Sequence, residues 1–346
     1  MWRLESECRC KILFMKIAIV KLSSLGDIVH AMVVLQFIKN HYPKIEIDWV
    51  VEKDFKELLE FHPDINQVHE VNIKKARKKK SLFLLINQLR KIRKFGSYDL
   101  VIDMQGLIKS ALVSRLMLSP ITLGFNKSSI RESIASIFYN KTFNYGYDEN
   151  VIERNVALIG FALGLNVSKQ QIEHKLPFLH SSQKHLNIDI SNTKKNILLV
   201  PGASHKSKCY PVSNLAEFTT LIDANFLIIW GDREEKIMAY KIKEISPSVN
   251  VCDKLSIDSL ISLISQVDLI IGPDTGPTHI GWALNVPSIT LFGPTPGYRN
   301  SYLTKVNKII ESNSEVNPYK IDKNDNSIKD IDIEEILQVS QDLLNQ

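Results

Sequence analysis

The feature that most constrains the fold is an alternation, repeated in both halves of the chain, between short runs of Val, Ile and Leu and longer segments with helical spacing. The apolar runs are KIAIVKL, IEIDWVV and YDLVIDM in the first half, and NILLVPG, FLIIWG, VDLIIG and SITLFG in the second. Uninterrupted apolar runs followed by helices are typical of parallel sheets that helices cover on both faces. The pattern therefore predicts an α/β protein with two doubly wound, Rossmann-like domains.

A chain of 346 residues is too long for a single ordinary core, so two domains are expected. The polar segment 175–195 lacks clear periodicity and marks the region of the boundary. The sequence predicts an N-terminal domain over 15–178, a C-terminal domain over 179–327 and a closing helix over 328–346. Residues 1–14 precede the first apolar run and are expected to be an extension with no role in the fold.

Composition excludes several classes of protein. No apolar run approaches the roughly 18 residues that a membrane-spanning helix needs, and the start of the chain lacks the apolar core of a secretory signal. The four cysteines, Cys8, Cys10, Cys209 and Cys252, show neither a zinc-binding spacing nor a disulfide framework. These features are typical of a reduced, cytoplasmic protein without a metal site.

Charge is distributed unevenly along the chain, whose formal net charge is +5. The first half is basic and the second mildly acidic, which indicates an anionic partner for the first half. The strongest charge feature is IKKARKKK, followed by RKIRK. Such a run usually forms a solvated, mobile face, and its alternative interpretation is a landing site for an acidic acceptor or an anionic membrane surface. No nucleic-acid-binding motif accompanies it.

Ligands of parallel α/β sheets bind beyond the carboxyl ends of the strands, where this sequence places its unusual residues. One such stretch is GPDTGPTH, which follows the run VDLII. Asp274 is expected to cap a helix whose first turn holds Pro277, and Gly276 permits a close approach to the backbone. The start of such a helix binds phosphate through its N–H groups and the helix dipole. We favour a phosphate site here over a capped helix without a ligand.

Three other strand ends carry polar residues with two interpretations each. Asp27, in SSLGDIVH, fits a helix N-cap as well as a general base, while His30 is interpreted as a core histidine. The loop ASHKSKCY is either solvated or supplies a lysine that neutralises a phosphate leaving group. In DREEK, Glu234 and Glu235 are either first-turn helix residues or acceptors for ribose hydroxyls.

Common nucleotide-binding and catalytic motifs are absent from the sequence. It contains no G-x-G, which excludes the nicotinamide and flavin fingerprint, and no P-loop motif. Neither the metal-binding H-E-x-x-H nor the nucleophile elbow G-x-S-x-G occurs. A two-domain α/β protein that binds phosphate without these motifs indicates an enzyme acting on a nucleotide sugar.

Four blocks of the sequence resemble the lipopolysaccharide heptosyltransferases, which form glycosyltransferase family 9. They are MKIAIVKLSSLGDIVHAMVVL, YDLVIDMQGLIKSALVSRL, RESIASIFYNK and GPDTGPTHIGWALNVPSITLFGPT, and they extend from Met15 to Thr295. The Asp-Thr-Gly-Pro-x-His block marks the family in general. The blocks DMQGLIKSA and RESIASIFYN favour type I of the family over types II and III.

The resemblance implies a GT-B fold, with two Rossmann-like domains facing a central cleft, and an inverting transfer that uses neither a metal ion nor another cofactor. The donor would be ADP-L-glycero-β-D-manno-heptose. The acceptor would be the Kdo sugar of Kdo-lipid A, in the inner core of the lipopolysaccharide of a Gram-negative bacterium. The protein would be a peripheral enzyme on the cytoplasmic face of the inner membrane, docked on its anionic surface, and no nucleic-acid partner is expected.

The resemblance also implies roles for individual residues. Asp27 would be the catalytic base, and Lys208 would act in catalysis beside the donor diphosphate. The other donor-binding residues would be Ser204, Glu235 at the ribose, Leu255 near the adenine, and Asp274, Thr275, Gly276, Thr278 and His279 in the phosphate loop. The acceptor-binding residues would be Ser23, Gly26, Lys74, Arg77, Lys78, Asp103, Gln105, Lys109 and Arg131. The sequence departs from the family pattern at Ala203 and at Cys209–Tyr210.

Two alternative functions belong to different classes. One is another nucleotide-sugar enzyme of the same architecture, such as a type II or III heptosyltransferase or a 2-epimerase, which would invert a free sugar nucleotide without an acceptor. The other is a non-catalytic basic module that binds nucleic acid through residues 74–94, with a steep dependence on salt.

Overall fold

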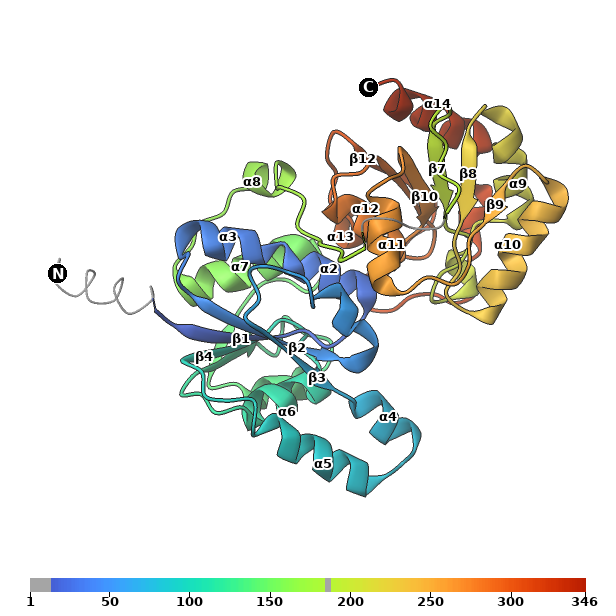
Figure 1. Cartoon of the computed structure of the whole chain (residues 1–346). Helices are drawn as coiled ribbons and strands as arrows, with labels where there is room; N and C mark the ends of the chain where they lie inside the picture. The colour runs from blue at the N-terminus through green and yellow to red at the C-terminus, as the bar shows by residue number, and fades with distance from the viewer. Residues whose placement is uncertain (1–13, 184–187) are drawn as a thin grey trace. The chain divides into compact units, whose positions relative to one another are not determined.

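The computed structural model describes residues 14–183 and 188–346, which fold into two compact units (Figure 1). Unit 1 ends at Ile172, and unit 2 runs from Glu173 to Gln346. Each unit contains one six-stranded parallel sheet and its own apolar core. The predicted fold class, two doubly wound α/β domains, is confirmed.

The sheet of unit 1 has the strand order β3-β2-β1-β4-β5-β6. Its strands are β1 Lys16–Val20, β2 Glu46–Glu52, β3 Gln67–Val71, β4 Leu100–Asp103, β5 Thr122–Phe125 and β6 Lys141–Phe143. Its helices are α2 Leu25–Met32, α3 Val34–His41, α4 Ile73–Lys78, α5 Leu82–Ile92, α6 Ile108–Leu116 and α7 Val151–Leu163, with the 3-10 helices η1 Lys53–Leu58 and η2 Ser133–Phe138. Helices α2, α3 and α7 cover one face and α5 and α6 the other (Figure 1). The short helix α8, Lys169–Glu173, ends at the limit between the units.

The sheet of unit 2 has the strand order β12-β11-β10-β7-β8-β9. Its strands are β7 Asn196–Leu199, β8 Asn225–Ile228, β9 Asn250–Val251, β10 Leu269–Pro273, β11 Ser288–Phe292 and β12 Asn307–Glu311. Its helices are α9 Val212–Leu221, α10 Arg233–Ile245, α11 Ile257–Ile264, α12 Gly276–Ala283, α13 Gly297–Asn300 and α14 Ile333–Leu344, with the 3-10 helices η3 Lys206–Lys208 and η4 Ser327–Asp330. Helix α9 packs against both α10 and α14, whereas α11 packs against α12.

The two sheets share one plan. Numbered within each unit and taken from the same end, both have the strand order 3-2-1-4-5-6. The direction of winding reverses between β1 and β4 in unit 1, and between β7 and β10 in unit 2. Ligands of doubly wound sheets bind beyond the carboxyl ends of the strands at such a switch point. The fold therefore defines one candidate ligand position in each unit.

Burial accounts for the uninterrupted apolar runs in the sequence. Strands β4, β7, β10 and β11 are buried along their whole length, because helices cover both faces of each sheet. The segment from Asp27 to Pro43, whose apolar residues have the spacing of a single helix, instead belongs to two helices that meet at Val33. Two adjacent β-branched residues, Val33 and Val34, weaken the helix at that point. None of the helices in the described ranges is both long and apolar enough to cross a membrane.

Candidate active site

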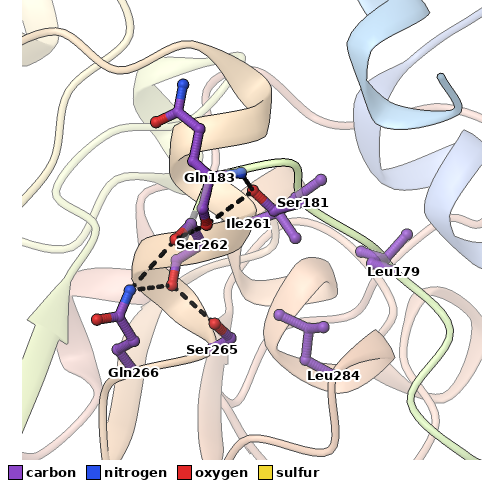
Figure 2. Close-up of a pocket in the computed structure, with 8 residues that line it drawn as sticks. All are labelled: Leu179, Ser181, Gln183, Ile261, Ser262, Ser265, Gln266 and Leu284. Atoms are coloured by element: carbon purple, nitrogen blue, oxygen red, sulfur yellow. Dashed lines mark hydrogen bonds between the residues drawn. The ribbon is translucent and has the colours of Figure 1, made fainter. Parts of the chain in front are cut away.

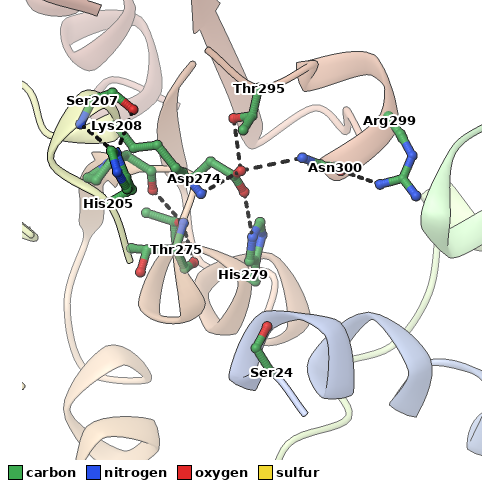
Figure 3. Close-up of polar contacts among 12 residues, drawn as sticks. Ser24, His205, Ser207, Lys208, Asp274, Thr275, His279, Thr295, Arg299 and Asn300 are labelled. Atoms are coloured by element: carbon green, nitrogen blue, oxygen red, sulfur yellow. Dashed lines mark hydrogen bonds and ion pairs between the residues drawn. The ribbon is translucent and has the colours of Figure 1, made fainter. Parts of the chain in front are cut away.

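A buried cluster of charged side chains lies at the switch point of unit 2 (Figure 3). Asp274, directly after β10, is only 6% exposed. Its Oδ2 lies 2.8 Å from Nζ of Lys208, and its Oδ1 lies 3.0 Å from Nε2 of His279. Lys208 ends η3, which follows β7, the strand beside β10, and His279 lies on α12. Neighbouring strands thus bring an anion, a cation and an imidazole together. We call these three residues the ion-pair cluster.

Two residues that the sequence analysis did not single out complete the surroundings of Asp274. The hydroxyl of Thr295 and the side-chain amide of Asn300 donate to its Oδ2, at 3.0 and 3.4 Å. Both follow β11, the next strand of the sheet, so the strand-end rule applied to SITLFG would have found them. Burial raises the pKa of Asp274, but the charge of Lys208 and the hydrogen bond to His279 outweigh it and hold that pKa well below its ordinary value.

Helix α12 begins differently from the prediction. Its N-cap is Thr275 rather than Asp274, because the carboxylate of Asp274 is engaged by the ion-pair cluster. The N–H of Thr275 donates to Oγ1 of Thr278, the third residue of the helix, at 3.4 Å. Gly276, the first residue of the helix, is partly exposed and is followed by Pro277. The start of α12 therefore keeps the features of a phosphate-binding helix terminus.

The loop after β7 places its polar side chains in different environments. Ser204 and Lys206 are exposed, and Lys206 pairs with Glu234 at 3.4 Å, a solvated contact that contributes little to stability. Lys208, in contrast, is only 9% exposed. Tyr210, where the sequence departs from the family pattern, is buried in the core, and its hydroxyl donates to a backbone carbonyl just before α14 at 2.8 Å. The solvated-loop interpretation thus describes Lys206 but not Lys208, which is buried and paired with Asp274.

Glu235, in the first turn of α10, lies against the backbone of two loops that follow neighbouring strands. Its Oε2 accepts the N–H of Gly231 at 2.6 Å. A Cβ built on Gly202 would lie 2.3 Å from Cγ of Glu235, so that only glycine leaves room for this side chain. Leu255, in the loop before α11, is partly exposed. The carboxylate of Glu235 is therefore fixed at the carboxyl end of the sheet.

Asp27 lies at the switch point of unit 1, in the first turn of α2. The N-cap of α2 is Ser24 rather than Asp27, and the carboxylate of Asp27 accepts the backbone N–H and the hydroxyl of Ser24, at 3.0 and 2.6 Å. Burial raises the pKa of Asp27, but the charge of Lys21 and the hydrogen bonds from Ser24 outweigh it, and that pKa lies below its ordinary value. Asp27 is thus an ionised carboxylate with a fixed orientation and partial exposure.

Two predicted acceptor residues shape the loop that precedes Asp27. The Oε1 of Gln105 accepts the N–H groups of Leu22 and Ser23, at 2.7 and 3.1 Å. Asp103, fully buried at the end of β4, accepts the N–H of Gln105 and the hydroxyl of Tyr139, both at 2.8 Å. Burial raises the pKa of Asp103. These contacts tie the loop after β1 to the loop after β4, across the switch point.

Lys109 brings a cation to the same loop. Its Nζ donates to Oγ of Ser23 at 2.9 Å. Burial lowers the pKa of Lys109, the charge of Glu52 opposes this shift, and the nearby Arg77 lowers the pKa further. Gly26, another predicted acceptor residue, is buried in the first turn of α2, directly after this loop.

The basic run of the sequence forms the short helix α4, at the carboxyl end of β3. Lys74, Arg77 and Lys78 are exposed, and Nζ of Lys74 pairs with Asp54 at 2.9 Å. Arg131, after β5, is also exposed. The predicted basic acceptor residues thus follow three strands, β3, β4 and β5, at the same end of the sheet.

A pocket of about 300 Å³ lies elsewhere in unit 2, between the segment 179–183 and α11 (Figure 2). Its polar groups bond one another. Oγ of Ser262 donates to the carbonyl of Gln183 at 2.8 Å, and Nε2 of Gln266 donates to the carbonyl of Ser262 at 2.9 Å. None of the predicted site residues lines it. Within the part of the chain that the structure describes, no three His, Cys, Asp or Glu side chains gather as metal ligands.

Two doubly wound units with polar clusters at their switch points define the class of the GT-B glycosyltransferases, and solved structures agree. The structure titled E. coli heptosyltransferase WaaC with ADP has a TM-score of 0.78 and 25% sequence identity, over 95% of this chain and all of that one. That of E. coli ADP-heptose lps heptosyltransferase II has a TM-score of 0.73 and 22% identity, over 96% and 99%.

Sequence comparison narrows this class to one family. The model of glycosyltransferase family 9 (heptosyltransferase) matches residues 86–329. Lipopolysaccharide heptosyltransferase 1 of Campylobacter coli is 39% identical over 344 residues, 95% of this chain and 99% of that protein. The protein of that name from Escherichia coli K12 is 28% identical, over 83% and 91%. The chain therefore belongs to glycosyltransferase family 9, the heptosyltransferases, and the predicted enzyme class is confirmed.

Proposed function

We propose that the protein transfers L-glycero-D-manno-heptose from ADP-heptose to the Kdo sugar of Kdo-lipid A, with inversion at the anomeric carbon and without a metal ion. The observation that carries this proposal is the pair of switch-point groups. Asp27 offers an ionised carboxylate in unit 1, and Lys208 offers a buried cation in unit 2. A base for the attacking hydroxyl and a cation for the departing diphosphate are the groups that a single-displacement transfer needs.

The donor is assigned to unit 2. The start of α12 and Lys208 would hold the diphosphate, and the fixed carboxylate of Glu235 would accept the ribose hydroxyls. Ser204 and Leu255 would contact the donor from the loops after β7 and β9. The structure titled E. coli heptosyltransferase WaaC with ADP-2-deoxy-2-fluoro heptose, with a TM-score of 0.75 and 25% identity, supports a nucleotide-sugar donor.

Asp274 has a positioning role in this scheme. An ammonium group carries three donors, so Lys208 can bond Asp274 and a diphosphate oxygen at the same time. The carboxylate holds Lys208 and His279 in place before the donor arrives, and Thr295 holds the carboxylate in turn. Groups that are oriented in advance need no reorganisation when charge develops on the leaving group.

The proposed reaction step gives each of these groups a role. The acceptor hydroxyl attacks the anomeric carbon, forming the new C–O bond, while the bond from that carbon to the β-phosphate oxygen of ADP-heptose breaks. Asp27 takes the hydroxyl proton, and ADP leaves with its charge stabilised by Lys208 and the N–H groups of α12. A carboxylate with a low pKa is a weak base, but the electron-poor anomeric carbon requires only modest activation of the nucleophile.

The acceptor is assigned to the basic end of unit 1. Kdo and the lipid A phosphates are anions, and Lys74, Arg77, Lys78, Lys109 and Arg131 supply cations there. Because the acceptor is a membrane lipid, the enzyme would work as a peripheral protein on the cytoplasmic face of the inner membrane.

The test measures ADP release from ADP-heptose in EDTA, with and without Kdo-lipid A. Release that depends on the acceptor is expected, and it would support the donor, the acceptor and metal independence together. ADP release with an already heptosylated acceptor but none with Kdo-lipid A would overturn the acceptor assignment. Release restored only by a divalent ion would overturn metal independence. Epimerisation of the free donor, or RNA binding without affinity for ADP, would overturn the proposed function as a whole.

A further inference from the structure

Exposed apolar side chains follow directly after the basic helix α4. We propose that residues 73–86, the docking segment, attach this enzyme to an anionic phospholipid membrane. Leu82, Phe83 and Ile86 insert among the headgroups, and Lys75, Lys79 and Lys80 bind lipid phosphates. The proposal rests on the proposed function only in taking the acceptor to be a membrane lipid. It adds the segment of the protein that contacts the membrane. It also adds a hydrophobic contribution to membrane binding, which would be weak if charge alone supported it.

The apolar part of the docking segment is open to solvent. Leu82, Phe83 and Ile86 are 70%, 71% and 38% exposed. Leu82 and Ile86 are one helical turn apart and share a face of α5, and Phe83 lies beside them. The hydroxyl of Ser81 accepts the N–H of Leu84 at 3.3 Å and fixes the start of the helix. Water-facing helix starts are normally polar, so three adjacent apolar side chains indicate a partner that removes them from water.

The basic part of the docking segment carries only positive charges, and no acidic residue follows it closely in the sequence. Residues 72–98 contain ten Lys and Arg and not a single Asp or Glu. Six of these cations lie in 74–80, and all six are exposed. Such a run complements the anionic surface of a membrane, and the acyl region beneath the headgroups offers an apolar medium to the side chains next to it. A nucleic acid would satisfy the charges but would leave Leu82 and Phe83 in water.

The docking segment lies at the functional end of unit 1. Helix α4 starts two residues after β3 ends, at the same end of the sheet as the proposed acceptor residues. Arg77 is close enough to Lys109 to lower its pKa, which links α4 to the loop that carries Ser23. A lipid-borne acceptor keeps its acyl chains in the bilayer, so a membrane contact at this end presents its sugar to unit 1. Lys75, Lys79 and Lys80, which the acceptor assignment does not use, are then available to the membrane.

The test is co-sedimentation of the full chain with phosphatidylcholine vesicles, with and without phosphatidylglycerol. We expect binding only to the anionic vesicles. Replacing Leu82→Ser and Phe83→Ser together should weaken that binding by at least about tenfold, because two large side chains no longer leave water. The matched control is Leu118→Ser, another exposed leucine of unit 1, at 56%, which should bind as the wild type does. Equal binding by the double variant and the wild type would overturn the insertion.

Two further sets of substitutions test separately the contribution of the lysine charges and the depth to which the segment inserts. The variant Lys75→Gln/Lys79→Gln/Lys80→Gln should bind anionic vesicles more weakly and with a shallower dependence on salt. A Phe83→Trp reporter should shift its emission to the blue and be quenched by brominated lipids. An unchanged emission spectrum on vesicles, or steep salt-dependent binding to RNA with none to vesicles, would overturn the proposal.

A water-soluble, deacylated acceptor separates this proposal from the proposed function. With it, the Leu82→Ser/Phe83→Ser variant should release ADP as fast as the wild type, whereas release with vesicle-borne Kdo-lipid A should fall by about tenfold or more. If the wild type releases no ADP with either acceptor, the proposed function fails, and the vesicle measurements still decide whether the segment docks.

Discussion

The carboxylate of Asp27 combines two tasks, and substitution can separate them. It accepts two hydrogen bonds from Ser24 at the start of α2, and it is the proposed base. We expect Asp27→Asn to lower kcat by roughly 10²- to 10⁴-fold, the usual contribution of a general base, with the affinity for ADP unchanged. Ser24→Ala is the matched control, since it removes one of these bonds and keeps the carboxylate. A kcat for Asp27→Asn close to that of Ser24→Ala would rule Asp27 out as the base.

Asp274 is expected to support stability in a pH-dependent way. Its pKa is lowered in the folded state, so its contribution is complete above the ordinary carboxyl pKa of about 4 and is lost as the pH falls through the folded value. Asp274→Asn should lower the free energy of unfolding by about 3–5 kcal/mol at pH 7, because Lys208 is left buried without its partner. Urea unfolding at pH 7 measures the cost of the substitution, and the difference between wild type and variant should narrow as the pH falls below about 4.

A double variant checks the cause of that loss. Asp274→Asn/Lys208→Met should recover part of the stability, since it leaves no unpaired buried charge, yet it should not bind ADP. Full recovery of ADP affinity in the double variant would show that Lys208 does not contact the diphosphate.

The loop after β7 and the start of α10 depend on each other, because the lack of a side chain at Gly202 leaves room for Glu235. Gly202→Ala would place a Cβ 2.3 Å from Cγ of Glu235 and must displace that side chain. We expect ADP binding to weaken by about tenfold, in line with the loss of one charge-assisted hydrogen bond. In a background with Glu235→Ala, the same glycine substitution should have no further effect. Calorimetric titration of the four proteins gives this cycle, and additive losses would contradict the mechanism.

The elements differ in how far the sequence predicted them. The continuous apolar strands were predicted correctly, because burial on both faces of the sheet favours an apolar residue at every position of the strand. The cap of α12 was not, since Asp and Thr are both good caps, and the choice of Thr275 depends on Lys208, which lies 66 residues away from Asp274. That pairing depends on β7 lying beside β10, which is a property of strand order and has no local signal. The residue roles taken from the family resemblance stay predictions.

For the whole molecule, the assignment of the donor to unit 2 and the acceptor to unit 1 predicts where bound ADP protects backbone amides from hydrogen exchange. Amide hydrogen exchange with ADP present should slow in unit 2, at the loop after β7 and the start of α12, and remain unchanged in the sheet of unit 1. The physical reason is linkage: ADP at a hundredfold excess over its Kd stabilises the unit that binds it by about 2.7 kcal/mol. Equal protection in both units would contradict the assignment of the donor to unit 2.

The repeated strand order has a consequence for how such a chain can evolve. Each unit has its own sheet, its own core and its own switch point, and each is encoded by one uninterrupted stretch of sequence. If unit 1 binds the lipid acceptor and unit 2 binds the nucleotide donor, as proposed, mutations can change which cell-surface lipid unit 1 recognises. The nucleotide-binding unit 2 can meanwhile be inherited unchanged. Recombination near the limit between the units would exchange whole recognition functions rather than fragments of a core.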